Sequence, residues 1–228
     1  KTVPTITLCL VFFLSAFCAS GQQMDWDKSM AAASAARQRG EYAKAAALYK
    51  SALAIQEKIL GPDHAAIAAS LNNLAVLYQD LYMYAQAEPL YEQSLAIWEK
   101  NPGTETQVVM SLKNLAALYH DEGKDTHAEP LYKRVLGILE KTGQGGSPEA
   151  AAALSSLGDI YRSQDKYGEA EPLYSRTLAI LENNGHLETP EAAVTLTHLA
   201  DIYYSQRKYD EAAPLFSRAL AISENIEP

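Results

Sequence analysis

An internal repeat with a period of about 42 residues constrains this chain more than any other feature of its sequence. One aromatic position recurs in each copy of the repeat, at Tyr49, Tyr91, Tyr132, Tyr174 and Phe216. An alanine lies four residues before each of these positions, and a leucine lies four residues after each. Because a single repeat cannot bury its own apolar face, copies must stack to form a continuous core. The sequence therefore predicts an array of five stacked repeats.

Each repeat has the pattern of two amphipathic helices. In the second repeat, Leu71, Leu74 and Leu77 recur every three residues, and after a short turn Ala87 and Tyr91 begin a second such stripe. This spacing places apolar side chains on one face of a helix. Alanine and leucine dominate the apolar residues, which favours helix over strand. We expect an all-α fold whose helix pairs occupy 27–62, 63–103, 104–146, 147–188 and 189–228, within an array over 22–228.

Helix boundaries are marked by capping residues and by small residues. Pro148 and Pro190 each follow a hydroxyl residue and precede a glutamate, which is typical of a helix start. Gly40 and Gly123 lie where the first helix must turn into the second, a position that suits a positive φ. Helix-capping side chains are expected at Asp63, Thr104, Ser147 and Thr189. Close crossing of the two helices is expected at the small pairs Ala75/Ala87, Ala116/Ala128, Gly158/Ala170 and Ala200/Ala212.

The first 21 residues have the pattern of a signal peptide. Lys1 precedes an apolar stretch, 6–17, that is too short to span a bilayer comfortably, and small residues follow it. Cleavage after Ser20 or Gly21 fits this pattern, and we expect an exported protein, periplasmic or secreted. Two alternatives keep a membrane attachment: an uncleaved anchor, or lipidation of Cys18, which the bulky Phe17 before it fits badly.

The sequence has no Met at position 1 and ends inside the repeat pattern, as a piece of a longer protein would. Both cysteines lie within the first 21 residues, so the mature chain would hold no disulfide and no cysteine metal site. The net charge of −9 and the absence of any Lys/Arg-rich run argue against a nucleic-acid-binding protein. We find no nucleotide loop, no nucleophile elbow and no metalloprotease helix, and the five histidines are scattered. We therefore expect no enzyme, no catalytic residue, no metal and no cofactor.

The segments at 53–64, 71–78 and 87–91 (LAIQEKILGPDH, LNNLAVLY and AEPLY) carry a resemblance to a known family. The pattern resembles the tetratricopeptide-repeat (TPR) family, in its 42-residue, kinesin-light-chain-type form, over nearly all of 27–228. This resemblance implies a right-handed α-solenoid whose first helices line a concave, peptide-binding surface. Asp125 departs from the family's usual tyrosine, and the first repeat lacks the large residues of its first helix.

The resemblance places the polar side chains of the first helices in this groove. Asn73 and Asn114 match the family's groove asparagine, whereas Ser156 and His198 depart from it. A carboxamide both donates and accepts hydrogen bonds, so it can hold the backbone of an extended peptide without reading its sequence. The predicted groove residues are Asn72, Asn73, Gln79, Asp80, Lys113, Asn114, His120, Ser156, Asp159, Arg162, His198 and Asp201.

Three functions remain open at this point. The leading hypothesis is an extracytoplasmic scaffold or adaptor that binds a peptide segment or protein on its concave face. The alternative is an assembly module that self-associates through an open repeat end, since the sequence stops directly after the fifth repeat. A third is an enzyme with an unrecognised site.

Overall fold

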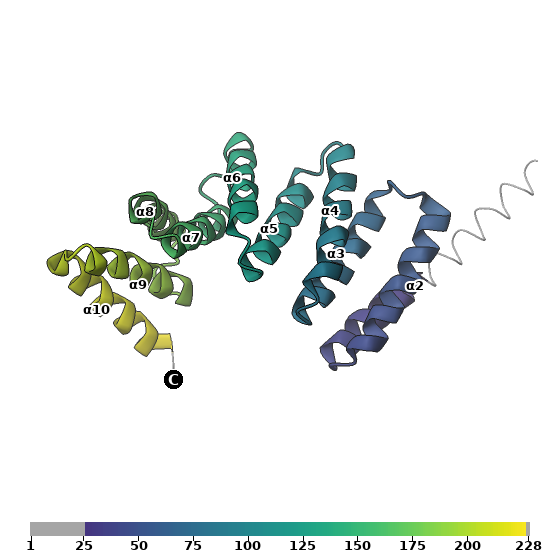
Figure 1. Cartoon of the computed structure of the whole chain (residues 1–228), viewed down its shortest axis with the longest axis horizontal. Helices are drawn as coiled ribbons and strands as arrows, with labels where there is room; N and C mark the ends of the chain where they lie inside the picture. The colour runs from purple at the N-terminus through teal and green to yellow at the C-terminus, as the bar shows by residue number, and fades with distance from the viewer. Residues whose placement is uncertain (1–25, 227–228) are drawn as a thin grey trace, which may run out of the picture. The chain divides into compact units, whose positions relative to one another are not determined.

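The structure is a computed structural model that describes residues 26–226. Ten α-helices and no β-strand occur among these residues, which confirms the all-α prediction. The predicted signal peptide, 1–21, lies outside the described residues. A helix over 26–38 is followed by the helices of Figure 1: α2 (Tyr42–Leu60), α3 (Ala65–Asp80), α4 (Tyr84–Lys100), α5 (Glu105–Asp121), α6 (Asp125–Lys141), α7 (Pro148–Ser163), α8 (Tyr167–Asn183), α9 (Pro190–Ser205) and α10 (Tyr209–Ile226).

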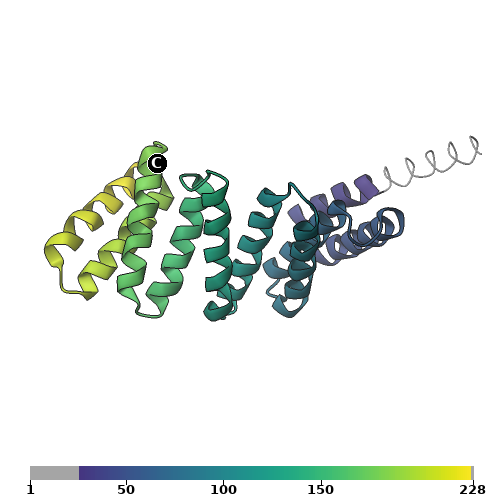
Figure 2. The ribbon, with the colours of Figure 1, turned by 90° about the horizontal axis from the view of Figure 1, so that it is seen from above.

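Successive helices pack as hairpins. The pairs α3/α4, α7/α8 and α9/α10 pack closely, and α2/α3, α6/α7 and α8/α9 pack between neighbouring repeats. Figure 2 shows α9 and α10 side by side, joined by a short turn. The chain divides within α5 into two compact units, an N-terminal unit that ends at Asn114 and a C-terminal unit that begins at Leu115.

Two of the predicted helix caps are confirmed. The hydroxyl of Ser147 accepts a hydrogen bond from the backbone N–H of Ala150 at 3.2 Å, and that of Thr189 accepts one from Ala192 at 3.3 Å. Each bond satisfies an N–H group that has no partner inside the helix. These caps fix the starts of α7 and α9, which carry the predicted groove residues Ser156, Asp159, Arg162, His198 and Asp201.

The prediction for Asp63 is wrong by one residue. The helix α3 begins at Ala65, and its cap is His64, whose Nδ1 accepts a hydrogen bond from the N–H of Ala66 at 3.2 Å. Asp63 instead receives a hydrogen bond from Lys100 Nζ at 2.7 Å. Thr104 precedes α5, and its hydroxyl donates to two carbonyl groups at the end of α4, at 2.7 Å each. The loops before α3 and α5 are therefore tied back to the end of α4.

A residue with positive φ separates the two helices of every repeat. Gly40 (φ 74°) and Gly123 (φ 71°) confirm the prediction, while Tyr82, Asp165 and Arg207 adopt φ values of 57–62° in the other repeats. In each case the following residue donates its N–H to the carbonyl group at the fifth position before it, at 2.7–2.9 Å. The turn is thus set by this backbone bond rather than by glycine, although a non-glycine residue adopts this conformation at some cost in strain.

The small residues at the helix crossings are buried. Ala75, Ala87, Ala116, Ala128, Ala170 and Ala200 are all 0% exposed, and Ala212 is 2% exposed. Gly158 is the one glycine in this set, and the ring of Tyr174 lies directly against it. A Cβ atom built on Gly158 would lie 2.8 Å from Cε1 of that ring, and the Tyr174 side chain is itself fully buried. The ring therefore occupies the space that the alanine methyl fills in other repeats.

We predict that Gly158→Ala lowers the free energy of unfolding. Overpacking a core costs roughly 1–3 kcal/mol, which exceeds the helix propensity of about 1 kcal/mol that alanine adds. The matched control is Gly137→Ala in α6, where an added Cβ would meet no atom within 4 Å, so this variant should be more stable than the wild type. Urea denaturation followed by circular dichroism measures both, and equal stabilisation of the two variants would contradict the packing account.

Candidate functional site

In the N-terminal unit, two of the predicted groove asparagines bond to each other. Asn114 Nδ2 donates to Asn72 Oδ1 at 2.8 Å, which links α5 to α3. The prediction that Asn72 lies on the open face is wrong. Its side chain is 7% exposed, because it borders the apolar stripe and the next first helix, α5, covers it. Asn73 and Lys113 are half-buried and stay available to a ligand.

Gln79 and Asp80 hold two other contacts at the end of α3. The hydroxyl of Tyr91 donates to Gln79 Oε1 at 2.8 Å. Arg37 reaches Asp80 Oδ2 with two nitrogens, Nε at 2.9 Å and Nη2 at 2.6 Å, and both side chains remain partly exposed. Arg37 belongs to the helix over 26–38, so this ion pair joins the first helices of repeats one and two.

A cavity of about 410 Å³ lies beside this ion pair. It is lined by Ser34, Arg37, Gln38, Tyr42, Tyr49 and Asp80. Only Asp80 was predicted from the sequence. The other residues were missed because the first repeat is degenerate, yet Ser34 and Arg37 occupy the repeat positions of Val76 and Gln79 and could have been found by that equivalence.

In the C-terminal unit, Asp159 of α7 lies at the centre of a polar cluster. The hydroxyl of Tyr174 donates to Asp159 Oδ1 at 2.7 Å, and Arg162 Nη2 lies 3.8 Å from the same oxygen. His198 Nδ1 of α9 also lies 3.0 Å from it, although its N–H does not point along that line, so the contact is an ion pair when His198 is protonated rather than an aligned hydrogen bond. The structure thus brings together three of the predicted groove residues.

The cluster shifts the ionisation of its members. Burial alone would raise the pKa of Asp159, but the contacts with His198 and Tyr174 and the positive charges of His198 and Arg162 outweigh burial, so this pKa lies below its usual range. Burial and the neighbouring Asp159 carboxylate raise the pKa of Tyr174 well above its usual range. Asp159 therefore stays ionised and Tyr174 stays protonated at neutral pH.

The remaining predicted residues of the C-terminal unit differ in their surroundings. His120 Nδ1 lies 2.6 Å from Asp125 Oδ1 at the start of α6. Burial raises the pKa of Tyr132, the buried aromatic residue of the third repeat, and Ser156 near its hydroxyl offsets part of this rise. Asp201 is exposed and makes no hydrogen bond or ion pair within the described part of the chain.

Tyrosine hydroxyls account for several of these polar positions. Tyr49 shares a hydrogen bond with Ser34 at 3.1 Å, and Tyr91 and Tyr174 donate to Gln79 and Asp159. A buried phenol needs a hydrogen-bond partner, and in the first, second and fourth repeats the first helix supplies it. Polar residues on these faces therefore have a structural role in addition to any role in binding.

Neither a metal-binding cluster nor a membrane-spanning helix is found among residues 26–226. No group of three or more His, Cys, Asp or Glu side chains there is placed to hold a metal ion. None of the helices in that range combines the length and apolar character needed to cross a bilayer.

Sequence comparison assigns the family. A profile of the tetratricopeptide repeat matches residues 28–100, 77–141, 107–183 and 149–225. The chain belongs to the tetratricopeptide-repeat family. Proteins of this family generally bind other proteins, which makes a protein-interaction scaffold the functional class of this chain. A search of curated protein sequences finds no match.

Solved structures agree with this assignment. A kinesin-light-chain candidate from Podosopora anserina, with nearly identical TPR-like repeats, is 27% identical, with a TM-score of 0.74 over 88% of this chain and 96% of that one. BtubC (BKLC) from P. vanneervenii shares the fold at 22% identity and a TM-score of 0.77, over 91% and 90% of the two chains. MamA shares it at 17% identity and a TM-score of 0.64, over 85% and 95%. The first likeness confirms the kinesin-light-chain-type form of the repeat.

We predict that Asp159→Asn reduces stability in a pH-dependent way. The folded-state pKa lies below the unfolded value of 3.8, so the carboxylate stabilises the fold above that value, and this contribution is lost as the pH falls through the folded pKa. The variant should lose about 1 kcal/mol at neutral pH, and the difference from the wild type should shrink below about pH 4. Urea denaturation over this pH range tests it, with the exposed Asp201→Asn as control. A difference that is constant with pH would contradict the role assigned to Asp159.

Proposed function

We propose that this protein is an extracytoplasmic TPR scaffold that binds a peptide segment or protein through the faces of its first helices. The observation that carries the proposal is that polar side chains on these faces, Asn73 and Lys113 in the N-terminal unit and Asp201 in the C-terminal unit, have no partner that the fold requires. Each unit therefore offers polar side chains on its own first helices that a ligand can engage.

The chemistry of the N-terminal unit suits recognition of a peptide backbone. The carboxamide of Asn73 can donate to a peptide carbonyl and accept from a peptide N–H, and Lys113 adds a donor on the next first helix. The Asn72–Asn114 bond holds α3 and α5 at a fixed distance beside them. Affinity would then come from backbone contacts, with selectivity from side chains elsewhere on the array.

The binding test replaces Asn73 and Lys113 together by alanine. Each lost hydrogen bond contributes about 0.5–1.5 kcal/mol, so affinity should fall roughly 5- to 150-fold. The ligand is a peptide selected from a random displayed library on the chain that begins at Gln22, and titration calorimetry measures its affinity. Circular dichroism should show unchanged helicity, since neither residue belongs to the apolar stripe.

The matched control replaces Lys58 and Gln93, which are exposed on the second helices α2 and α4. Loss of affinity in this pair, with none in the Asn73/Lys113 pair, would refute the first-helix face. The rival function, self-association, is supported by Leu220 and Tyr209 of α10, which are 60% and 53% exposed. A mass that rises with concentration in sedimentation, without selection of any peptide, would favour that rival.

We also propose that the protein is exported with removal of residues 1–20 or 1–21. The support is the sequence pattern alone, in which a positively charged start, a short apolar stretch and small residues follow in order. Intact-mass analysis of protein from the extracytoplasmic fraction should give an N-terminus at Gly21 or Gln22. Retention of Lys1, or a lipid on Cys18, would refute the cleavage.

A further inference from the structure

The open face of α9 combines acidic and apolar side chains with no lysine or arginine. Glu191, Val194, Asp201 and Tyr204 are exposed and lie three, seven and three residues apart, which places them on one face of the helix. Val194 and Tyr204 are 50% and 59% exposed, so this face carries apolar as well as acidic surface. No Lys or Arg occurs anywhere in α9.

The neighbouring first helix, α7, adds a carboxylate to this stripe. Asp159 occupies the same repeat position as Asp201, and its contact with His198 places it against α9. Glu149 and Glu191 also occupy equivalent positions, but both lie in the first turn of a helix, where the helix dipole favours an acid. Asp201 lies far beyond the first turn, so the dipole does not account for it.

The need to pair a buried tyrosine hydroxyl does not account for Asp201 either. In the fourth repeat, Asp159 accepts a hydrogen bond from the buried Tyr174. The corresponding aromatic residue of the fifth repeat is Phe216, which has no hydroxyl to satisfy. Asp201 thus has no tyrosine hydroxyl to accept a bond from, unlike Asp159 in the fourth repeat, and its carboxylate is unpaired within residues 26–226.

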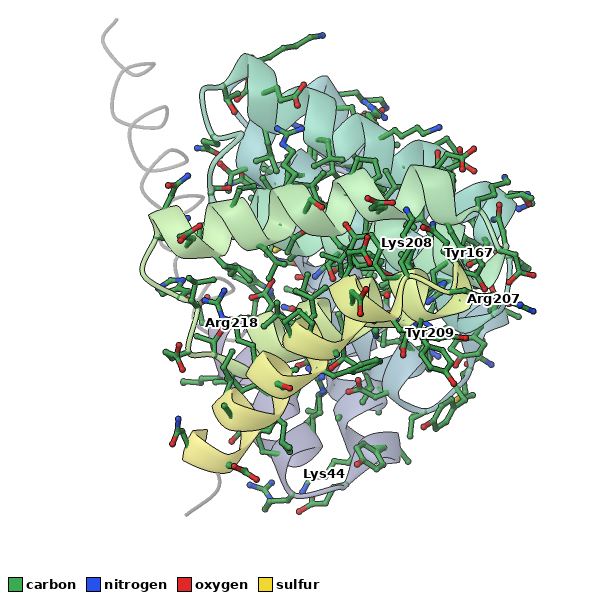
Figure 3. The ribbon with its side chains drawn as sticks, turned by 90° about the vertical axis from the view of Figure 1, so that its left-hand side faces the viewer. Lys44, Tyr167, Arg207, Lys208, Tyr209 and Arg218 are labelled. Atoms are coloured by element: carbon green, nitrogen blue, oxygen red, sulfur yellow. The ribbon has the colours of Figure 1, made fainter. Side chains whose placement is uncertain are left out.

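Cationic side chains accompany this face at Asp159, which contacts Arg162 and His198, and in the turn after α9. Arg162 is 3.8 Å from Asp159, and Arg207 and Lys208 lie in the turn after α9, together with Tyr209 (Figure 3). Lys208 Nζ lies 5.4 Å from the centre of the Tyr203 ring. Over residues 115–226 as a whole, 17 Asp and Glu outnumber 10 Lys and Arg, whereas the counts are 9 and 8 over residues 26–114. The acidic excess of the chain therefore belongs to the C-terminal unit.

We propose that the α7–α9 face of the C-terminal unit binds an extended peptide segment that carries a lysine or arginine between apolar side chains. This inference rests on the proposed function and names the chemistry of its partner. The cation is held by Asp201, and Val194 and Tyr204 contact the apolar residues on either side. Along the helix, Val194 lies about 10 Å from Asp201 on one side and Tyr204 lies about 4.5 Å from it on the other. An extended peptide brings side chains to one face roughly every 7 Å, so each apolar side chain has to bend by about 3 Å to make its contact.

The test uses three fluorescent peptides of about twelve residues that differ only in charge. In each peptide, Leu and one variable residue alternate at every second position with Gly or Ser between them, so that both lie on one face of the extended chain. The variable residue is Lys, Glu or Gln. Fluorescence anisotropy should show the Lys peptide binding most tightly, with weakening as salt rises from about 0.05 to 0.5 M. Asp201→Asn should weaken the Lys peptide about 1.4- to 5-fold, and Tyr204→Ala should weaken all three peptides. The matched control, Glu182→Gln on the exposed side of α8, should change nothing.

Three outcomes overturn this inference. They are tighter binding of the Glu peptide, unchanged binding of the Lys peptide by Asp201→Asn, and no binding of any of the three peptides. The proposed function is judged separately, by the library-selected peptide and the Asn73/Lys113 variant. If that peptide binds through the N-terminal unit while the Lys peptide fails, the scaffold function stands and only the basic partner is refuted.

Discussion

The rest of this structure depends on one buried tyrosine in the second helix of each of the first four repeats. Tyr91 and Tyr174 are both 0% exposed, and they fill the space that the small residues at the helix crossings leave open. A phenol ring in this position buries a large apolar area, but its hydroxyl must find a partner. The partner is a polar side chain of the first helix, such as Gln79 or Asp159. Packing of the core thus dictates part of the chemistry on the open face.

The helical architecture could be read from the sequence because it follows from local periodicity. The recurrence of apolar residues predicted each helix pair, and the hydroxyl caps at Ser147 and Thr189 were found from their neighbours alone. The cap of α3 could not be placed to the residue, since His64 and Asp63 are both able to cap and only the loop geometry chooses between them. Similarly, Tyr82 and Arg207 gave no local signal of a positive φ, because the backbone bond of the turn imposes it.

The candidate site was less predictable, because contacts between repeats decide which of its side chains are buried or paired and which stay exposed. Asn72 and Asn73 are adjacent in sequence and identical in type, yet one is buried by the next first helix and the other is half-open. Asp159 and Asp201 occupy the same repeat position, yet only the first is held by a tyrosine and a histidine. Periodicity assigns a residue to a face of its helix. It does not show which side chain from a distant part of the sequence contacts that residue.

A ligand would affect the stability of the fold differently at Asp159 and at Asp201. A ligand that engages Asp159 must share a carboxylate that already accepts a bond from Tyr174 and lies against His198, so binding there would weaken contacts that stabilise the fold. A ligand that engages Asp201 displaces only water, and the flanking Val194 and Tyr204 gain burial at the same time. Asp201 is free of a structural task because Phe216 stands in place of a tyrosine.

Restoring the hydroxyl by Phe216→Tyr would give Asp201 an internal partner. This variant should therefore raise the stability of the fifth repeat and lower the affinity of α9 for a cationic ligand. Denaturation and anisotropy measured on that one variant would show whether the two effects are linked, and a gain in stability with unchanged binding would separate them.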